Sequence, residues 1–418
     1  MHADRNAARV RLLIFGLLTL LIGAGALWYF WARLPVTAGS LRLTPISFSE
    51  VPGWADNDPR AALAAFRRSC AVMSKSQATR AMGGAGYAGT IGDWQGVCSA
   101  TPSGNVSVAA ARIFFETWFA PATVGAGSDS QGLFTGYYEP ELRASRARTG
   151  VYRTPIYGLP DDLVSVDLGL FKSALHDERI AGRVDGHSLV PYATRAEIDA
   201  NGLAHAPVLL YADDPIAVFF LHIQGSGRVQ LPDGSFLRLA FAAVNGRAYT
   251  PIGRTLIAQG ALDRQSVSLQ SIRAWLLAHP EEARSVMDSD DSFVFFQETP
   301  LGDPSLGSPG TEGAALTPGA SLAVDPHLHA LGAPFFVAAT SPDPDAAKPD
   351  RSFSRLLIAQ DTGGAIKGAV RGDVFWGFDT SAKAIAGRMK SPGRFYVLLP
   401  KSLATDLAPY QDYPGASQ

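Results

Sequence analysis

One stretch near the C-terminal end limits the fold more than any other part of the chain, because it joins two aspartates to apolar runs and glycines. It reads Leu357-Ile-Ala-Gln-Asp361-Thr-Gly-Gly and continues to Gly372-Asp373-Val-Phe-Trp-Gly377. Glycines permit tight turns, and the apolar runs are typical of short strands. We predict that Gly363 and Gly364 adopt backbone angles closed to other residues, and that a strand begins just after Asp373. Two carboxylates at strand ends suit acid–base chemistry, and the alternative is that both are only turn residues.

The N-terminal end carries a second strong signal, an uncharged apolar run over residues 12–31. Its length matches the hydrocarbon core of a bilayer, and Arg5, Arg9 and Arg11 precede it. The positive-inside rule predicts a membrane anchor with residues 1–11 in the cytoplasm and everything after Arg33 outside it. The alternative is a cleaved signal peptide, since Ala24-Gly-Ala26 resembles a cleavage site.

Composition excludes several classes of protein. The chain has 36 Lys and Arg against 38 Asp and Glu, a formal charge of −2, and no basic stripe typical of nucleic-acid binding. The eight histidines show no metal-ligand spacing, so we expect no metal and no cofactor. Only Cys70 and Cys98 are present, and in an exported protein we expect them to form a disulfide; two buried free thiols are the alternative.

Hydrophobic periodicity predicts helices over residues 59–70, 107–118 and 266–287. Ser103 or Asn105 is expected to cap the second helix, and Pro280 to interrupt the third. Strands are predicted at 132–140, 217–224, 235–244, 293–296, 322–325, 335–338 and 395–399. Residues 299–320 and 341–351 are predicted loops, because prolines and glycines gather there.

Several familiar catalytic motifs do not fit. The turn Gly225-Ser-Gly227 lacks the third glycine of a dinucleotide fingerprint and the preceding glycine of a nucleophile elbow. The triplets Asp361-Thr-Gly and Asp379-Thr-Ser resemble the signature of aspartic proteases. Those enzymes bring two aspartates together from separate lobes, and triplets 18 residues apart are too close for that.

A set of motifs spread from Phe134 to Leu399 resembles the membrane-bound lytic murein transglycosylase A family. They are Thr135-Gly-Tyr-Tyr-Glu-Pro140, Tyr152-Arg-Thr-Pro-Ile-Tyr157, Pro191-Tyr-Ala-Thr-Arg-Ala-Glu197, Phe220-Leu-His-Ile-Gln-Gly-Ser-Gly-Arg228, Asn245-Gly-Arg-Ala-Tyr-Thr-Pro-Ile-Gly253, Ser321-Leu-Ala-Val-Asp-Pro326 and Ala359-Gln-Asp-Thr-Gly-Gly-Ala-Ile-Lys-Gly368. The three aspartates typical of the family match Asp325, Asp361 and Asp373. The chain departs from the family where Ala320 replaces an expected arginine and Asp288-Ser-Asp-Asp291 replaces an Asn-Pro pair.

The resemblance implies a mainly β fold, with a double-psi β-barrel domain, an inserted second β-rich domain, N-terminal helices and a transmembrane helix. The expected parts are a cytoplasmic tip and anchor (1–35), N-terminal helices with the first part of the barrel (36–140), the inserted domain (141–290), the three-aspartate part of the barrel (291–400) and a tail (401–418). A glycan strand would lie between the two β-rich domains.

The resemblance also assigns roles to residues. Asp373 matches the catalytic acid, and Asp361 is expected to support it, with a structural turn role as its alternative. Tyrosine faces stack on sugars and glycines let a polymer pass close to the backbone, although one tyrosine of the adjacent pair is expected to face the core. The residues expected to contact substrate are Thr135, Tyr137, Tyr138, Glu139, Gln224, Gly225, Ser226, Gly227 and Asp325, the last with a structural alternative.

The expected function is non-hydrolytic cleavage of the MurNAc-β-1,4-GlcNAc bond of peptidoglycan, which leaves 1,6-anhydro-MurNAc ends. One carboxyl group suffices for it, because the 6-hydroxyl of the sugar can attack the anomeric carbon. Two alternatives stay open: an expansin-like wall-binding protein without activity, and a lysozyme-like hydrolase in which Asp361 is the second carboxylate. Expected partners are peptidoglycan glycan strands, the membrane and a wall-remodelling complex, and nucleic acid is not among them.

Overall fold

The computed structural model describes residues 41–175, 178–405 and 411–413, which belong to one compact unit spanning residues 40–418. The apolar run at residues 12–31 lies outside the described residues, so the predicted anchor stays a prediction. Within the described part of the chain, every helix is too short or too polar to cross a bilayer.

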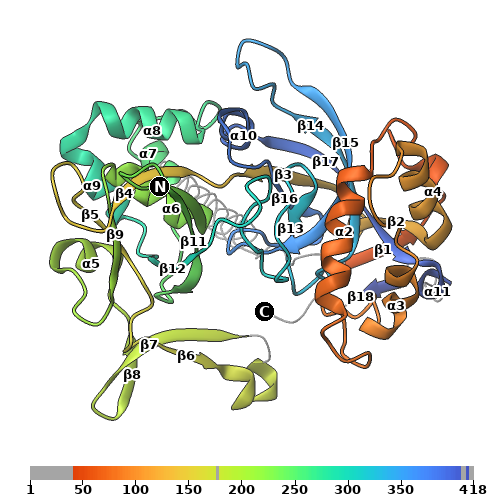
Figure 1. Ribbon diagram of the computed structural model, residues 1–418, viewed down its shortest axis with the longest axis horizontal. Coiled ribbons are helices and arrows are strands. Elements are labelled where there is room, and N and C mark those ends of the chain that lie inside the picture. The colour runs from red at the N-terminus through yellow and green to blue at the C-terminus, as the bar shows by residue number, and fades with distance from the viewer. Residues whose placement is uncertain (1–40, 176–177, 406–410, 414–418) are drawn as a thin grey trace, which may run out of the picture. The chain divides into compact units, whose positions relative to one another are not determined.

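A closed barrel forms the part of the unit that carries the three aspartates (Figure 1). Its strands are hydrogen-bonded in the order β14-β15-β13-β16-β3-β17, and β17 pairs back onto β14 to close the ring. The pairs β13–β15 and β16–β3 are parallel, which requires long crossovers, whereas β14–β15 is an antiparallel hairpin. The barrel strands are β3 (Gln131–Tyr137), β13 (Ser321–Ala323), β14 (Pro334–Ser341), β15 (Arg351–Asp361), β16 (Arg371–Phe375) and β17 (Lys390–Pro400).

Three further strands extend the barrel sheet beyond β17. They pair in the order β2-β1-β18, with β2 at Phe119–Ala126, β1 at Leu41–Pro45 and β18 at Gln411–Tyr413. The ends of the described chain are therefore joined in one sheet.

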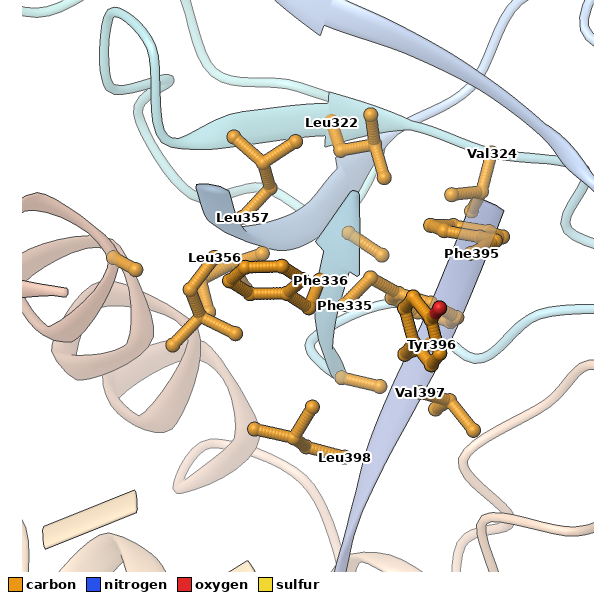
Figure 2. Packing of buried hydrophobic residues seen from close by; sticks show 14 of the residues in the cluster. Leu322, Val324, Phe335, Phe336, Leu356, Leu357, Phe395, Tyr396, Val397 and Leu398 are labelled. Carbon is orange, nitrogen blue, oxygen red and sulfur yellow. The ribbon is translucent and has the colours of Figure 1, made fainter. Parts of the chain in front are cut away.

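Large apolar side chains fill the barrel and its flank (Figure 2). Phe335 and Phe395 stack with their ring centroids 4.6 Å apart, and Phe336 lies beside Tyr396 on the same two strands. Leu322 and Leu357 approach from β13 and β15, and all of these side chains are buried. Close packing of this kind holds the strands that carry the aspartates in fixed positions.

Residues between β3 and β13 form a second, six-stranded sheet in the order β12-β11-β10-β4-β9-β5. An isolated bridge between Gly158 and Phe296 connects its two outer strands, and a small sheet β6-β7-β8 lies apart from it (Figure 1). The predicted mainly β fold, with a barrel and a second β-rich part, is confirmed; the predicted domain boundaries stay a prediction. The strands are β4 (Glu141–Ser145), β5 (Thr154–Tyr157), β6 (Val164–Asp167), β7 (Arg179–Asp185), β8 (Ser188–Pro191), β9 (Val208–Ala212), β10 (Ser226–Gln230), β11 (Phe236–Val244) and β12 (Val294–Thr299).

The predicted strand at residues 217–224 is wrong, because the structure has helix α6 (Pro215–Gln224) there. Asp214 caps the helix by accepting hydrogen bonds from the backbone of Ile216 and Ala217, and Gly225 ends it in the left-handed conformation. A short apolar run fits a buried strand or a buried helix equally well, and these caps decide between them. Its apolar side chains pack with α7 (Ile252–Ala258), α8 (Leu269–Ala278) and α9 (Pro280–Asp288), the last two separated at Pro280 as predicted.

The N-terminal helices α2 (Arg60–Met73), α3 (Ile91–Ser99) and α4 (Val108–Trp118) share the core of the barrel domain. Cys70 and Cys98 form the predicted disulfide between α2 and α3. The cap of α4 is Ser107, which accepts a hydrogen bond from the backbone of Ala110, and not Ser103 or Asn105. The apolar pattern locates a helix within a few residues but does not choose among neighbouring cap residues.

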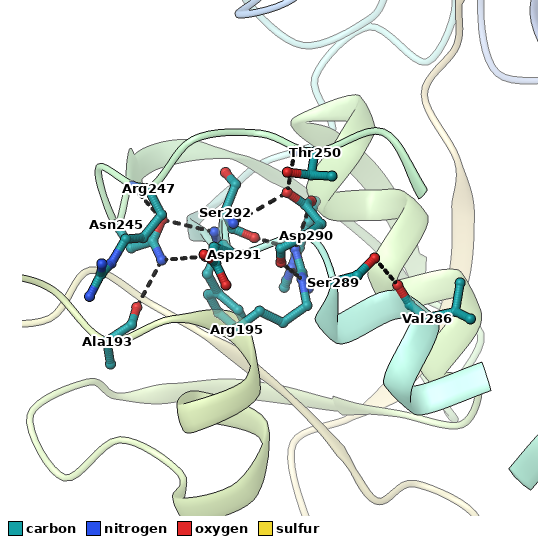
Figure 3. Close-up of polar contacts among 12 residues, drawn as sticks. Ala193, Arg195, Asn245, Arg247, Thr250, Val286, Ser289, Asp290, Asp291 and Ser292 are labelled. Atoms are coloured by element: carbon teal, nitrogen blue, oxygen red, sulfur yellow. Dashed lines mark hydrogen bonds and ion pairs between the residues drawn. The ribbon is translucent and has the colours of Figure 1, made fainter. Parts of the chain in front are cut away.

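A buried polar cluster holds the unusual segment 288–292 (Figure 3). Arg195, the first residue of α5 (Arg195–Asn201), donates to the carbonyls of Asp290 and Ser292, and Asn245 donates to the carbonyls of Ala193 and Asp291. Asp290 is fully buried and lies 3.7 Å from the Arg195 guanidinium. Of the aspartates that stand in place of the expected Asn-Pro pair, Asp290 therefore has a structural role.

Candidate active site

Three adjacent strands bring the two predicted catalytic aspartates together. Ala323 of β13 pairs with Asp361 of β15 on one side and with Asp373 of β16 on the other. On the far side of β16, Asp373 pairs with Thr135 of β3. Asp361 is the last residue of β15, as predicted, but Asp373 lies inside β16 and not before a strand. A position inside a paired strand fixes the backbone of Asp373 more firmly than a turn would.

Asp373 is held on one of its two oxygens only. The Thr135 hydroxyl donates to Asp373 Oδ1 at 2.6 Å, and Arg371 donates to the same hydroxyl at 2.8 Å. A guanidinium only donates, so the proton of Thr135 must point to the carboxylate. Oδ2 has no hydrogen-bond partner among the described residues and is not sealed from solvent.

The pKa of Asp373 is raised, first because burial penalises the charged form, and also because the charge of Asp361 is near. The Arg371 charge and the hydrogen bond from Thr135 oppose this shift. The raised pKa favours the protonated form, which a general acid needs.

Asp361 differs because both of its oxygens are engaged. Oδ1 accepts from the backbone of Thr362 at 2.9 Å and from the backbone and hydroxyl of Thr311 at 3.0 and 3.1 Å. Oδ2 accepts from the Tyr137 hydroxyl at 2.8 Å. Burial raises the pKa of Asp361 and these hydrogen bonds oppose the rise. A carboxylate occupied in this way is suited to positioning and is poorly placed to activate a water molecule.

Tyr137 completes the link between the two aspartates. It faces Phe375 with the ring centroids 5.3 Å apart, and the two residues pair between β3 and β16. The pKa of Tyr137 lies well above its ordinary value, because partial burial of the hydroxyl penalises its charged form and Asp361 is beside it. The hydroxyl therefore remains a neutral donor at any physiological pH.

Asp325 holds the loop between the two catalytic strands. Its Oδ2 accepts from the backbone of Gly368 at 2.8 Å, and its Oδ1 from the backbone of His327 at 3.2 Å. Asp325 is buried, which favours its structural alternative, and its contact with substrate stays a prediction. Gly368 takes the left-handed backbone conformation with φ of 111°, whereas Gly363 and Gly364, where we predicted it, do not.

Two other residues expected to contact substrate are buried. Glu139 is fully buried and paired with Arg228 and Arg238, whose Nε atoms lie 2.9 and 2.7 Å from its carboxylate oxygens. Tyr138 is packed against α10 (Thr380–Ala386), and burial raises its pKa to about 12. Neighbouring residues of an extended segment face opposite ways, so Tyr137 faces the site and Tyr138 the core.

The turn after α6 lies beside this segment. Gln224 Oε1 accepts a hydrogen bond from the backbone of Tyr138 at 3.1 Å, which connects the turn to the end of β3. Gln224, Gly225 and Ser226 remain partly exposed, whereas Gly227 is buried and a Cβ there would meet Leu221 at 2.5 Å. The glycine at 227 therefore serves packing, and the other three remain available to a ligand.

Sequence reasoning missed Arg371 and Thr311. Arg371 stands two positions before Asp373, so it shares its strand face, and alternation along the strand could have indicated it. Thr311 lies in the long segment between β12 and β13, where neither periodicity nor a motif marks it.

Other chemistries find no support in the described residues. No group of three or more His, Cys, Asp or Glu side chains among them is arranged to hold a metal ion. Asp379, the aspartate of the second protease-like triplet, caps α10 by accepting from the backbone of Ala382 at 2.6 Å. Because Asp379 serves as a helix cap, it does not pair with Asp361 as the two aspartates of a protease site would.

Models of known protein families match both β-rich parts of the fold. Residues 133–297 match the family model "MltA specific insert domain", and residues 320–399 match the "3D domain". The chain is similar to proteins named membrane-bound lytic murein transglycosylase A from Vibrio cholerae (33% identity) and Escherichia coli K12 (32% identity), each match covering 65% of this chain and 67% of the relative.

Solved structures agree over more of the chain. A membrane-bound lytic murein transglycosylase from Agrobacterium tumefaciens aligns with 33% identity and a TM-score of 0.76, covering 87% of this chain and 99% of that one. MltA from Neisseria gonorrhoeae aligns with 34% identity and a TM-score of 0.72, covering 91% and 96%.

Proposed function

The chain belongs to the membrane-bound lytic murein transglycosylase A family, and from this premise we propose how it acts. It cleaves the MurNAc-β-1,4-GlcNAc bond of peptidoglycan without water and leaves 1,6-anhydro-MurNAc ends. Asp373 is the one acid–base group of the reaction.

The unequal engagement of the two aspartates supports this proposal most directly. Oδ2 of Asp373 accepts no hydrogen bond from any described residue, and the pKa of Asp373 is raised. Asp361 accepts hydrogen bonds on both oxygens. A hydrolase with two carboxylates needs the second one free to activate water or to attack the sugar. We therefore assign the acid–base role to Asp373 alone.

In the first step, protonated Asp373 donates its proton to the glycosidic oxygen. The bond between that oxygen and the anomeric carbon breaks, and the electron pair leaves with the GlcNAc hydroxyl. Positive charge develops on the MurNAc ring, and the Asp373 carboxylate now formed stabilises it. Thr135 and Arg371 stabilise that carboxylate through Oδ1.

In the second step, the 6-hydroxyl of the same MurNAc attacks the anomeric carbon. Asp373 accepts the hydroxyl proton, which returns the enzyme to its starting state and closes the 1,6-anhydro ring. No water is consumed. Holding the nucleophile within the substrate supplies the orientation that a hydrolase must provide for water.

Asp361 and Tyr137 act by position and charge. Their hydrogen bond holds Tyr137 and Asp361 in position, and the charge of Asp361 adds to the rise in the pKa of Asp373. We assign sugar contacts to Thr135 and Tyr137, and to the partly exposed Gln224, Gly225 and Ser226.

The relatives are named membrane-bound, and we propose that this chain is likewise an envelope protein. The uncharged run at residues 12–31 would anchor it, with the catalytic body on the periplasmic side of the inner membrane. Membership of a wall-remodelling complex belongs to the same proposal.

Incubation of the purified chain with insoluble murein tests the function. We expect turbidity to fall and muropeptides to appear in solution. Binding to murein without release of soluble fragments would instead favour the expansin-like alternative.

A further inference from the structure

A cavity of about 870 Å³ has a lining that includes neither Asp361 nor Asp373. It is lined by the start of α2, the loop at residues 104–106, Gly319 and the middle of β15. Its volume is typical of sites that take a small-molecule or short-peptide group.

Three arginines and two aspartates line this cavity, so its charge is 3 − 2 = +1. Arg60 is already paired with Asp58 through hydrogen bonds of 2.6–3.0 Å, and Asp56 is exposed. The two other arginines, Arg67 and Arg355, make no hydrogen bond with any described residue.

The unpaired donors are the strongest sign of a ligand. Nε and Nη2 of Arg67 are buried and have no partner among the described residues. Asn57, only 5% exposed, uses Oδ1 to accept from the backbone of Leu356, but its buried Nδ2 has no partner in the same part of the chain. A buried N–H donor without an acceptor destabilises the folded protein. Several such donors in one place are therefore suited to binding a ligand that brings acceptor oxygens.

The local structure keeps Arg355 available. A Cβ at position 319 would stand 2.7 Å from Arg355 Nη1, and Gly319 has φ of 66°, so a glycine makes room for the guanidinium. The guanidinium carbon lies 5.2 Å from the centre of the Phe353 ring and 6.0 Å from that of Trp376. Aromatic faces restrain a guanidinium without using its N–H donors.

The cavity is also connected to the catalytic strands. Arg355 and Asp361 lie on the same strand, β15, and the backbone of Gly319 donates to the carbonyl of Phe375, two residues after Asp373. The cavity and the aspartates are therefore built on shared strands.

We propose that this cavity binds a carboxylate of the peptide that branches from the murein glycan, and so helps to select peptide-bearing substrate. Guanidinium groups match the two oxygens of a carboxylate, and the amide of Asn57 adds a neutral donor. The inference rests on the proposed function, since it assumes that murein is the substrate.

Direct binding of a small probe is the first test. The acidic dipeptide L-alanyl-γ-D-glutamate is titrated into the full-length protein by calorimetry, with its diamide as the uncharged control. We expect saturable binding of the acid only, weakened about tenfold or more in Arg67→Gln and Arg355→Gln, because each removes charge-assisted hydrogen bonds. Arg143→Gln, an equal change of charge at an exposed surface pair with Asp213, should leave the affinity unchanged.

No saturable binding to the wild type would overturn the proposal, and so would equal affinity in the wild type and both cavity variants. Thermal unfolding of each variant checks its fold. If Arg67→Gln does not fold, Arg355→Gln decides, because Arg355 is exposed and its removal breaks no hydrogen bond with the described residues.

A kinetic test separates this inference from the proposed function. Murein with its peptides and glycan chains freed of them by an amidase are compared as substrates. We expect the wild type to have a KM several-fold lower for the peptide-bearing form, and Arg355→Gln to lose that difference at unchanged kcat. Equal KM values in the wild type would overturn the inference and leave the proposed function standing, whereas cleavage of neither substrate would overturn the proposed function.

Discussion

Glu139 and Asp373 are both carboxylates that the fold withdraws from bulk water, but their surroundings differ. Glu139 is paired directly with two guanidiniums, and Arg228 and Arg238 also bind the carbonyl of Leu306. Asp373 has one hydroxyl donor, and its arginine acts through that hydroxyl. A buried carboxylate paired on both oxygens with two cations has no oxygen left for a ligand, whereas Asp373 keeps one oxygen for substrate.

The difference between Glu139 and Asp373 indicates that separate residues provide stability and catalysis. The Glu139 cluster fastens the second sheet to the segment that carries Thr311, which in turn holds Asp361. The rigid region thus supports the reactive one. Changes at the two carboxylates should therefore be seen in different measurements.

Asp373→Asn should give the largest loss. The amide keeps the shape and the acceptor for Thr135 but has no proton to donate, so the rate of murein cleavage should fall by about 10²–10⁴ or more. Release of soluble muropeptides measures it, with circular dichroism and murein sedimentation as controls for fold and binding. Activity equal to that of the wild type would remove Asp373 from the mechanism.

Glu139→Gln should mainly lower stability. It leaves two buried guanidiniums without a counter-charge, which typically costs roughly 3–5 kcal/mol in the free energy of unfolding. Denaturant titration measures this. The matched control is Glu298→Gln, which breaks a pair with the exposed Arg146 and should cost about 1 kcal/mol or less. Equal losses in the two variants would contradict the structural role of Glu139.

Asp361→Asn should cost less activity than Asp373→Asn. It weakens the hydrogen bonds from Tyr137 and Thr311 but leaves the proton donor in place, so a loss of about 10- to 100-fold is expected. Steady-state kinetics on murein compare the two variants. A loss as large as that of Asp373→Asn would support the hydrolase alternative, in which both carboxylates take part in the chemistry.

Arg371→Gln should have the smallest effect, a shift in the pH profile. The positive charge lowers the pKa of Asp373, so its removal lets that pKa rise further. The first step needs protonated Asp373, and activity is lost as pH rises through this pKa. The alkaline limb of kcat/KM should therefore move to higher pH in the variant. A shift to lower pH, or none, would mean that Arg371 does not act on Asp373.

The family resemblance predicted the barrel, and the two cysteines of an exported chain predicted the disulfide; the structure bears out both. The motifs also indicated Asp361 and Asp373, which the fold brings to neighbouring strands, while their roles stay predictions. Sequence reasoning failed at α6, where a buried helix and a buried strand have the same apolar composition. It also placed Glu139 at the substrate, since a motif indicates that residues are near a site but not which way each side chain points. The contact of Thr311 with Asp361 joins residues 50 positions apart, and no local pattern could have indicated it.

Digestion of murein in ¹⁸O-labelled water tests the central claim, that one half-satisfied carboxylate cleaves the glycan without water. Mass spectrometry of the muropeptides reads the outcome at each new end. We predict 1,6-anhydro-MurNAc ends that carry no label, because the 6-hydroxyl of the sugar is the nucleophile. Reducing ends that carry ¹⁸O would contradict this and assign water activation to the site.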